Sequence, residues 1–187
     1  ISSMELSNFL VSKDVAHWLW DSDSKYRNVV RPILNGQEFA SDPDLLPTRF
    51  VIDFGERDEI EARLYPLAFE IVEREVKPIR STDNRAARRE RFWKFGEIAK
   101  GLYEKLKQCE YGLARQFTGE YWFWERIPGG IVYTNALVIV ARFDPAEFAF
   151  LQSSIHESWA HIQGSSLHTR FRYTPSRCFG TFPQPVG

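Results

Sequence analysis

The sequence predicts an α+β fold, a mixed domain with antiparallel β elements and several packed helices. Two observations predict it. Residues with helical spacing fill the segment from Asp58 to Cys109, whereas β-branched and aromatic runs follow from Tyr121 to Ala141. With 187 residues, of which 43% are hydrophobic and 15% aromatic, the chain has enough apolar surface for a sizeable core. We therefore expect residues 1–187 to form a single domain.

The first half of the chain is predicted to be mainly helical. Ser24 to Val30 predicts a short helix, and the apolar run from Phe50 to Phe54 predicts a strand. Apolar residues from Asp58 to Val76 recur at helical spacing, which predicts a helix that Pro66 kinks and Pro78 ends. We expect a further helical region from Arg85 to Cys109, weakened at Gly96 and Gly101 and capped by Gly112.

The second half predicts strands followed by a helix. Tyr121 to Arg126 and Ile131 to Ala141 flank Ile127-Pro128-Gly129-Gly130, a pattern typical of a hairpin. Asp144 and Pro145 give the start signature of a helix that ends at Gly164. Its apolar stripe is formed by Phe148, Leu151, Ile155, Trp159 and Ile162. Leu167 to Tyr173 alternates in character and predicts a strand that ends before Pro175.

Composition excludes two classes of protein. No run of about eighteen apolar residues predicts a membrane span, and the start of the sequence has no signal-peptide pattern. Cys109 and Cys178 lack the spacing of a zinc site, so we interpret them as free thiols. These features predict a cytoplasmic protein without a membrane partner.

The charges are segregated along the chain although the net charge is only −1. Acidic residues dominate from Ser41 to Glu75, and basic residues dominate from Val76 to Lys107. After Glu157 the sequence has no acidic residue but keeps Arg170, Arg172 and Arg177. Because the distribution of charge decides whether a face attracts phosphates, this pattern suits nucleic acid. A C-terminal strand with solvated arginines is the simpler alternative.

Several motifs in the same order resemble one family of proteins. The clearest are Ser153-Ser154-x-His156-Glu157-x-Trp159-Ala160, then Gly164 to Leu167 and Arg172 to Pro175. Upstream matches are Asn28 to Gly36, Arg49 to Gly55, Tyr65-Pro66, Val76 to Pro78, Arg91 to Gly96 and Gly130 to Val138. Together they resemble the target recognition domain of large bacterial S-adenosylmethionine-dependent DNA (adenine-N6) methyltransferases and combined restriction-modification enzymes.

The resemblance implies a recognition domain and no catalysis by this chain alone. The family's catalytic domain carries a glycine-rich cofactor loop and an Asn/Asp-Pro-Pro-Tyr/Phe loop, and the sequence contains neither. S-adenosylmethionine is therefore expected in the parent enzyme, bound by a methyltransferase domain of the same polypeptide. Ile1-Ser2-Ser3-Met4 also favours a fragment of a larger protein. The expected partner is double-stranded DNA, with adenine as the target base.

Candidate site residues follow from the resemblance and from the charges. By motif, the positions that vary with the recognised sequence are Asn135, Ala136, His168, Arg170 and Arg172. On a strand, His168, Arg170 and Arg172 project from one face, and arginine pairs with guanine edges. Arg88, Arg89, Arg91, Lys94, Thr118 and Arg177 are candidates for phosphate contacts. Thr118 stands where many family members have Val-Ser/Thr-Lys, so the hydroxyl is present without the lysine.

Catalytic interpretations of the same region are discounted. His156 and His161 are five residues apart, about 140° around a helix, so they cannot share a metal. Ser153 and Ser154 lack the glycine-flanked elbow of a nucleophile, and His156 is predicted to pack or to be capped. At least two residues of Tyr121 to Trp124 are expected in the core. The alternative function is a protein-interaction module that docks through the His156 and Trp159 helix without reading DNA.

Overall fold

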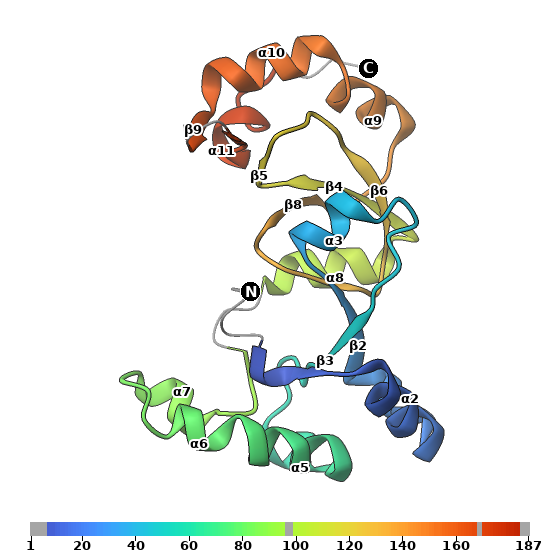
Figure 1. Cartoon of the computed structure of the whole chain (residues 1–187), viewed down its shortest axis with the longest axis vertical. Helices are drawn as coiled ribbons and strands as arrows, with labels where there is room; N and C mark the ends of the chain where they lie inside the picture. Colours follow the sequence, from blue (N-terminus) through green and yellow to red (C-terminus); the bar gives the residue numbers. More distant parts are fainter. Residues whose placement is uncertain (1–6, 96–98, 168–169, 184–187) are drawn as a thin grey trace. The chain divides into compact units, whose positions relative to one another are not determined.

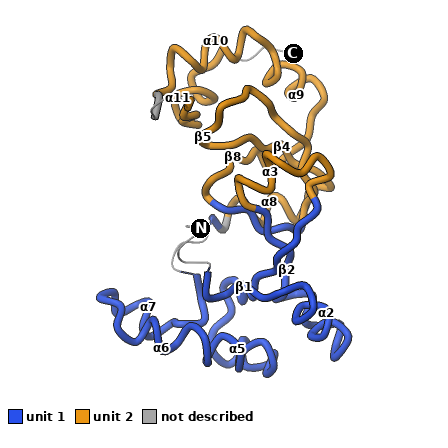
Figure 2. Tube along the Cα trace, viewed as in Figure 1, with its two compact units in different colours: residues 1–34, 46–99, 130–134 blue, residues 35–45, 100–129, 135–187 orange. Residues whose placement is uncertain are grey.

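The computed structural model describes residues 7–95, 99–167 and 170–183. The chain forms two compact units that each contain several separate segments (Figure 2). Unit 1 comprises residues 1–34, 46–99 and 130–134, and unit 2 comprises residues 35–45, 100–129 and 135–187. Helices and mainly antiparallel strands occur in both units, which confirms the predicted α+β class (Figure 1).

Unit 1 is built on a four-stranded sheet with the order β1-β3-β2-β7. The strands are β1 (Leu10–Val11), β2 (Val30–Leu34), β3 (Arg49–Ile52) and β7 (Val132–Tyr133). β3 runs antiparallel to β1 and β2, whereas β2 and β7 are parallel. The predicted strand at Phe50 is therefore confirmed as a central strand, and Phe50, Val51 and Ile52 are buried.

Capping side chains and prolines mark the starts of several helices in unit 1. They are η1 (Ser7–Phe9), α2 (Lys13–Ser22), η2 (Ser24–Asn28), α4 (Glu59–Arg63), α5 (Pro66–Glu75), α6 (Lys77–Arg80) and α7 (Ala86–Glu90). The single helix predicted from Asp58 is wrong. Asp58 does cap α4, but Pro66 starts α5 and Pro78 lies inside α6. Proline lacks an amide hydrogen, which the first turn of a helix does not need, so it begins helices here.

The predicted helical region from Arg85 to Cys109 is also divided. α7 belongs to unit 1, and α8 (Lys100–Gln108) belongs to unit 2. Gly96 lies outside the described residues, and Gly101 lies within α8. Gly112 is not a cap: it lies inside β4, where an added methyl group would come 2.8 Å from the carbonyl oxygen of Val140.

One sheet of unit 2 has the order β6-β4-β8. Its strands are β4 (Tyr111–Gln116), β6 (Glu125–Pro128) and β8 (Leu137–Val140), all antiparallel. The predicted hairpin is wrong, because β6 and β8 both pair with β4 instead of with each other. Sequence alternation marks which residues form strands, but it does not specify the partner of each strand.

The second sheet of unit 2 has the order β5-β10-β9. Its strands are β5 (Thr118–Gly119), β9 (Ser165–Leu167) and β10 (Arg170–Arg172). The strand expected from Leu167 to Tyr173 is therefore two strands, which pair antiparallel in a register that sets Arg172 opposite Ser165. Pro175 does not end regular structure but begins α11 (Pro175–Cys178).

The remaining helices of unit 2 are α3 (Gly36–Ser41), α9 (Pro145–Leu151) and α10 (Ser154–Gln163). Asp144 caps α9 as predicted, through its side chain and the amide of Glu147. The helix then breaks, because the Ser153 hydroxyl accepts from the amide of His156 and caps a new helix. This break ends the predicted apolar stripe: Ile155 and Ile162 are 72% and 77% exposed.

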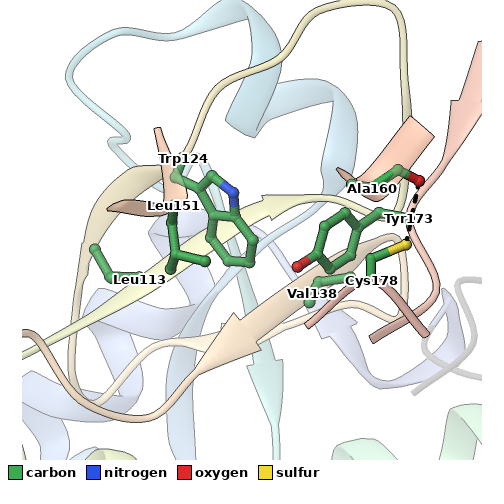
Figure 3. Close-up of a cluster of buried hydrophobic side chains, with 7 residues drawn as sticks. All are labelled: Leu113, Trp124, Val138, Leu151, Ala160, Tyr173 and Cys178. Carbon is green, nitrogen blue, oxygen red and sulfur yellow. Dashed lines mark hydrogen bonds between the residues drawn. The ribbon is translucent and has the colours of Figure 1, made fainter. Parts of the chain in front are cut away.

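The core of unit 2 lies where these helices meet the sheets. It contains Leu113, Trp124, Val138, Leu151, Ala160, Tyr173 and Cys178 (Figure 3). Of the predicted aromatic run, Trp124 is buried and Trp122 packs against the cluster, whereas Tyr121 is 71% exposed. Cys109 and Cys178 are free, as predicted, and the Cys178 thiol faces the carbonyl of Ala160 at 3.7 Å (Figure 3). None of the helices in the described residues has the length and hydropathy that crossing a membrane requires.

Candidate nucleic-acid interface

Two of the predicted reading arginines share one face of β10. Arg170 and Arg172 are exposed, and Phe171 between them is turned toward the protein. Phe171 packs against the buried cluster of unit 2, and its ring lies 4.4 Å from that of His161, centre to centre. Because alternate residues of a strand share a face, Arg170 and Arg172 project together, as the sequence predicts. His168, the third predicted member, lies outside the described residues.

Arg172 is positioned by its neighbours on β5. Its Cα is the register partner of Thr118, and its Cζ lies 5.0 Å from the ring centre of Phe117. The amide of Tyr173 donates to the carbonyl of Phe117 at 2.8 Å. Thr118 is half-buried on the edge strand β5, and Arg172 is exposed on the neighbouring central strand β10.

The Asn135-Ala136 pair lies beside the same segment. The carbonyl of Ala136 accepts from the amide of Phe117 at 2.8 Å, and both Asn135 and Ala136 are exposed. Gly36 at the start of α3 also packs here, because a methyl group added to it would lie 2.8 Å from the Cβ of Ala136. The Gln116 side chain donates to the carbonyl of Gly36 at 2.8 Å. The fold thus brings segments near residues 36, 117, 136 and 172 together in unit 2.

The remaining phosphate candidates are more dispersed. Arg177 is exposed on α11, and the described residues show no hydrogen bond or ion pair of its side chain. Arg88, Arg89, Arg91 and Lys94 belong to unit 1, so they are not part of the compact unit that holds the reading arginines. Arg88 lies 3.6 Å from a carboxylate oxygen of Asp83, and Arg89 donates to the Asp83 carbonyl at 2.6 Å.

Arg115 is a notable residue that the sequence did not single out. It is 1% exposed, and its Cζ lies 4.1 Å from the ring centre of Trp122 and 4.7 Å from that of Tyr173. Burial lowers the pKa of Arg115 to about 10, so the guanidinium stays charged at neutral pH. Its position two residues after Leu113, on the same face of a strand that was not predicted, is the sequence signal that could have found it.

His156 is a packing residue, as the sequence predicts. It is fully buried, and its Nε2 lies 2.9 Å from the hydroxyl of Tyr173. Burial, followed by the charge of Arg115, lowers the pKa of His156 to about 4. A buried side chain cannot contact a partner protein. The alternative function, docking onto another protein, would therefore depend on other residues of α10. Within the described part of the chain, no group of histidine, cysteine and acidic residues is arranged to hold a metal ion.

Comparison with known proteins gives one family and one fold. The family model described as MmeI, target recognition domain, matches residues 2–186. Among solved structures, the chain is similar to the Type IIL restriction-modification enzyme MmeI in complex with DNA, with a TM-score of 0.74 and 21% sequence identity. The match covers 99% of this chain and 24% of that chain, so this chain spans about a quarter of the length of that protein. Comparison with the curated proteins finds no match.

Proposed function

Because the chain belongs to the family of MmeI target recognition domains, we propose that it reads a short sequence of duplex DNA for a restriction-modification enzyme. The family model covers residues 2–186, which is nearly the whole chain. The solved structure with the same fold contains MmeI with DNA. Neither comparison identifies the bases that this chain would recognise, so the assignment of individual residues depends on their geometry.

The observation that carries the proposal is the register between β5 and β10. It sets Arg172 opposite Thr118, while the Phe117 amide bonds to Ala136. Residues from separate parts of the sequence thereby lie close together, and the guanidinium of Arg172 lies over the ring of Phe117 in an exposed position. Arginine in the major groove donates to O6 and N7 of guanine, and asparagine pairs with adenine. We assign base reading to Arg170, Arg172 and the Asn135-Ala136 pair.

Chemistry on the base belongs to the rest of the parent polypeptide. In the proposed enzyme, a separate methyltransferase domain binds S-adenosylmethionine and methylates the target base, adenine at N6, after the base leaves the stack. The glycine pair of this chain does not suit a cofactor: an added methyl group at Gly129 would lie 2.5 Å from the carbonyl oxygen of Cys109, so backbone fills the space. This chain would contribute only the position of the DNA. We place the activity in the cytoplasm, with the DNA.

A second function is supported by the exposed side of α10. Ile155 and Ile162 are 72% and 77% exposed and lie seven residues apart, two turns along the same helix. Such a stripe suits docking onto another protein domain. Docking through apolar residues would change little with salt, whereas binding to phosphates weakens steeply.

Selection from a randomised duplex pool tests the proposal. The chain is incubated with the pool at about 100 mM salt, where non-specific binding is partly suppressed, and retained molecules are sequenced. We expect an enriched motif of several base pairs. Retention without any motif would show that the domain holds phosphates but does not read bases. No retention even at low salt would favour the docking function of α10.

A further inference from the structure

Unit 1 contains a small pocket whose lining is mostly cationic. It has a volume of about 160 Å³ and is lined by Arg80, Ala87, Arg88, Arg91, Lys94 and Phe95. These residues come from α6, α7 and the segment that follows α7. Four of the six side chains carry a positive charge, and no acidic residue is among the six. A pocket with this lining attracts an anion.

Two of the cations are held in place by backbone carbonyls. Arg80 is 7% exposed, and its Nη1 donates to the carbonyls of Phe92 and Lys94. The Nζ of Lys94 donates to the carbonyl of Glu56 at 2.7 Å. These carbonyl partners fix the positions of the two groups. The pocket is therefore preorganised, and a bound anion would not have to order flexible side chains first.

The other two cations differ in how far they are neutralised. Arg88 lies 3.6 Å from a carboxylate oxygen of Asp83. Arg91 is exposed, and the described residues show no hydrogen bond or ion pair of its guanidinium. Arg91 thus contributes an uncompensated charge at the pocket. Arg89 is on the same short helix, but its side chain bonds to the Asp83 carbonyl and does not line the pocket.

Size restricts the class of ligand. Sites for drug-sized molecules and cofactors have volumes of roughly 300 to 1,000 Å³. A volume of about 160 Å³ is smaller than that, so the pocket suits a single anionic group and excludes a nucleotide as a whole. Planar guanidinium groups match phosphate oxygens by bidentate hydrogen bonds. A phosphate group combines the charge and the acceptors that this lining requires.

We propose that this pocket binds one phosphate group, and that in the protein–DNA complex the group is a phosphate of the DNA backbone. The DNA assignment rests on the proposed function, whereas the affinity for phosphate does not. The pocket would hold the duplex without reading its sequence, because phosphates are the same at every base pair. Among the basic residues of this region, the proposal selects Arg91, with Arg80, Arg88 and Lys94, and it leaves Arg89 out.

The test compares Arg91→Gln with the matched variant Arg89→Gln in the whole chain. Each variant removes one positive charge from the same region, and circular dichroism checks that both fold. Binding to a duplex is measured across a salt series. We expect Arg91→Gln to reduce the slope of log K against log salt by about 0.9, the value for one phosphate, on all sequences alike. Arg89→Gln should keep the slope of the unmodified chain.

Inorganic phosphate provides the second arm. It should raise the unfolding temperature of the unmodified chain and of Arg89→Gln, but not that of Arg91→Gln, relative to chloride at equal ionic strength. Equal reductions of the slope in both variants would overturn the pocket in favour of a diffuse basic surface. Phosphate stabilisation without any change of slope would overturn the DNA assignment. If the unmodified chain binds no DNA at all, the proposed function fails. The experiment with inorganic phosphate then tests by itself whether the pocket binds a phosphate group.

Discussion

The guanidinium of Arg115 stacks on the indole of Trp122, with 4.1 Å between Cζ and the ring centre. The rings of Tyr173, Phe171 and Trp124 lie 4.7, 5.6 and 5.7 Å away. Arg115 forms no ion pair within the described residues, and its Nη1 has no hydrogen-bond partner. The lowered pKa indicates that the loss of hydration outweighs the attraction of the charge to its surroundings.

Replacing Arg115 with methionine should therefore leave the free energy of unfolding unchanged or raise it by about 1 to 3 kcal/mol. Methionine keeps much of the buried volume and removes the uncompensated charge. Arg115→Ala should instead cost about 2 to 4 kcal/mol, because it leaves a cavity between the rings. Chemical denaturation measures both values.

Arg126 provides the control for Arg115. Its Cζ lies 4.3 Å from the ring of Tyr111, but the residue is exposed. An exposed guanidinium loses little of its hydration on folding, so removing its charge regains little free energy. Arg126→Met should therefore change stability by less than about 1 kcal/mol. A large loss of stability in Arg115→Met would show that stacking outweighs burial, contrary to the prediction.

His156 should make the protein sensitive to acid. Its pKa falls from 6.5 to about 4 in the fold, so between these values the unfolded chain binds a proton that the folded chain does not. The stabilising contribution of the neutral imidazole is complete above about pH 6.5. It is lost as the pH falls toward 4, by about 3 kcal/mol in total.

The variant His156→Gln isolates this effect. Glutamine does not titrate, so the variant should lose less stability than the unmodified chain between pH 6.5 and 4 in denaturation experiments. His161, whose side chain is 54% exposed, is the control, and His161→Gln should keep the original pH profile. Identical profiles for the two variants would contradict the assignment of the acid sensitivity to His156.

The sequence predicted where a helix begins better than it predicted which strands pair with each other. Asp144 caps a helix as expected, because a side chain that bonds to an amide three residues ahead is visible in a short window of sequence. The break at Ser153 was missed, since a serine within an apolar stripe is compatible with either one helix or two. The predicted hairpin was wrong because alternation distinguishes the two faces of a strand but does not say which other strand pairs with it.

The same contrast holds for the candidate site: features within one strand were predicted, but contacts between strands were not. Alternation alone places Arg170 and Arg172 on one face, as the structure confirms. The position of Arg172 opposite Thr118 depends on which strand pairs with β10, and the sequence gives no signal for this pairing. The Arg115 cluster was not predicted, because no strand was predicted from Tyr111 to Gln116.

Gly36 should be intolerant of any side chain. An added methyl group would lie 2.8 Å from the Cβ of Ala136, closer than carbon atoms pack. Gly36→Ala should therefore push on the Asn135-Ala136 segment and cost about 1 to 3 kcal/mol of stability. Because the remaining neighbours of the new methyl group are at 3.6 Å or more, Ala136→Gly should restore most of this loss in the double variant.

A thermodynamic cycle measures this coupling. Stability is determined for both single variants and the double variant, and DNA affinity is determined alongside it. A coupling near zero would mean that the two segments adjust independently, contrary to the close packing of Gly36 against Ala136. Gly101, which has no atoms within 4 Å of an added methyl group, gives the control substitution Gly101→Ala.

Arg172 provides the sharpest test of base reading. Arg172→Ala should weaken binding to the selected sequence by about 1 to 3 kcal/mol and relax the preference at one base pair. Arg172→Lys should not restore the preference, because lysine cannot form the bidentate pair. Binding is measured on the selected duplex and on duplexes changed at single positions.

Arg177→Ala is the comparison for Arg172→Ala. Arg177 is a phosphate candidate, so its loss should weaken all duplexes alike and lower the salt slope without moving the preference. The unfolding temperature of Arg172→Ala must also be measured, because Arg172 contacts the ring of Phe117. If Arg172→Ala weakens selected and random duplexes equally in a folded protein, Arg172 holds a phosphate, and base reading depends on Arg170 and the Asn135-Ala136 pair.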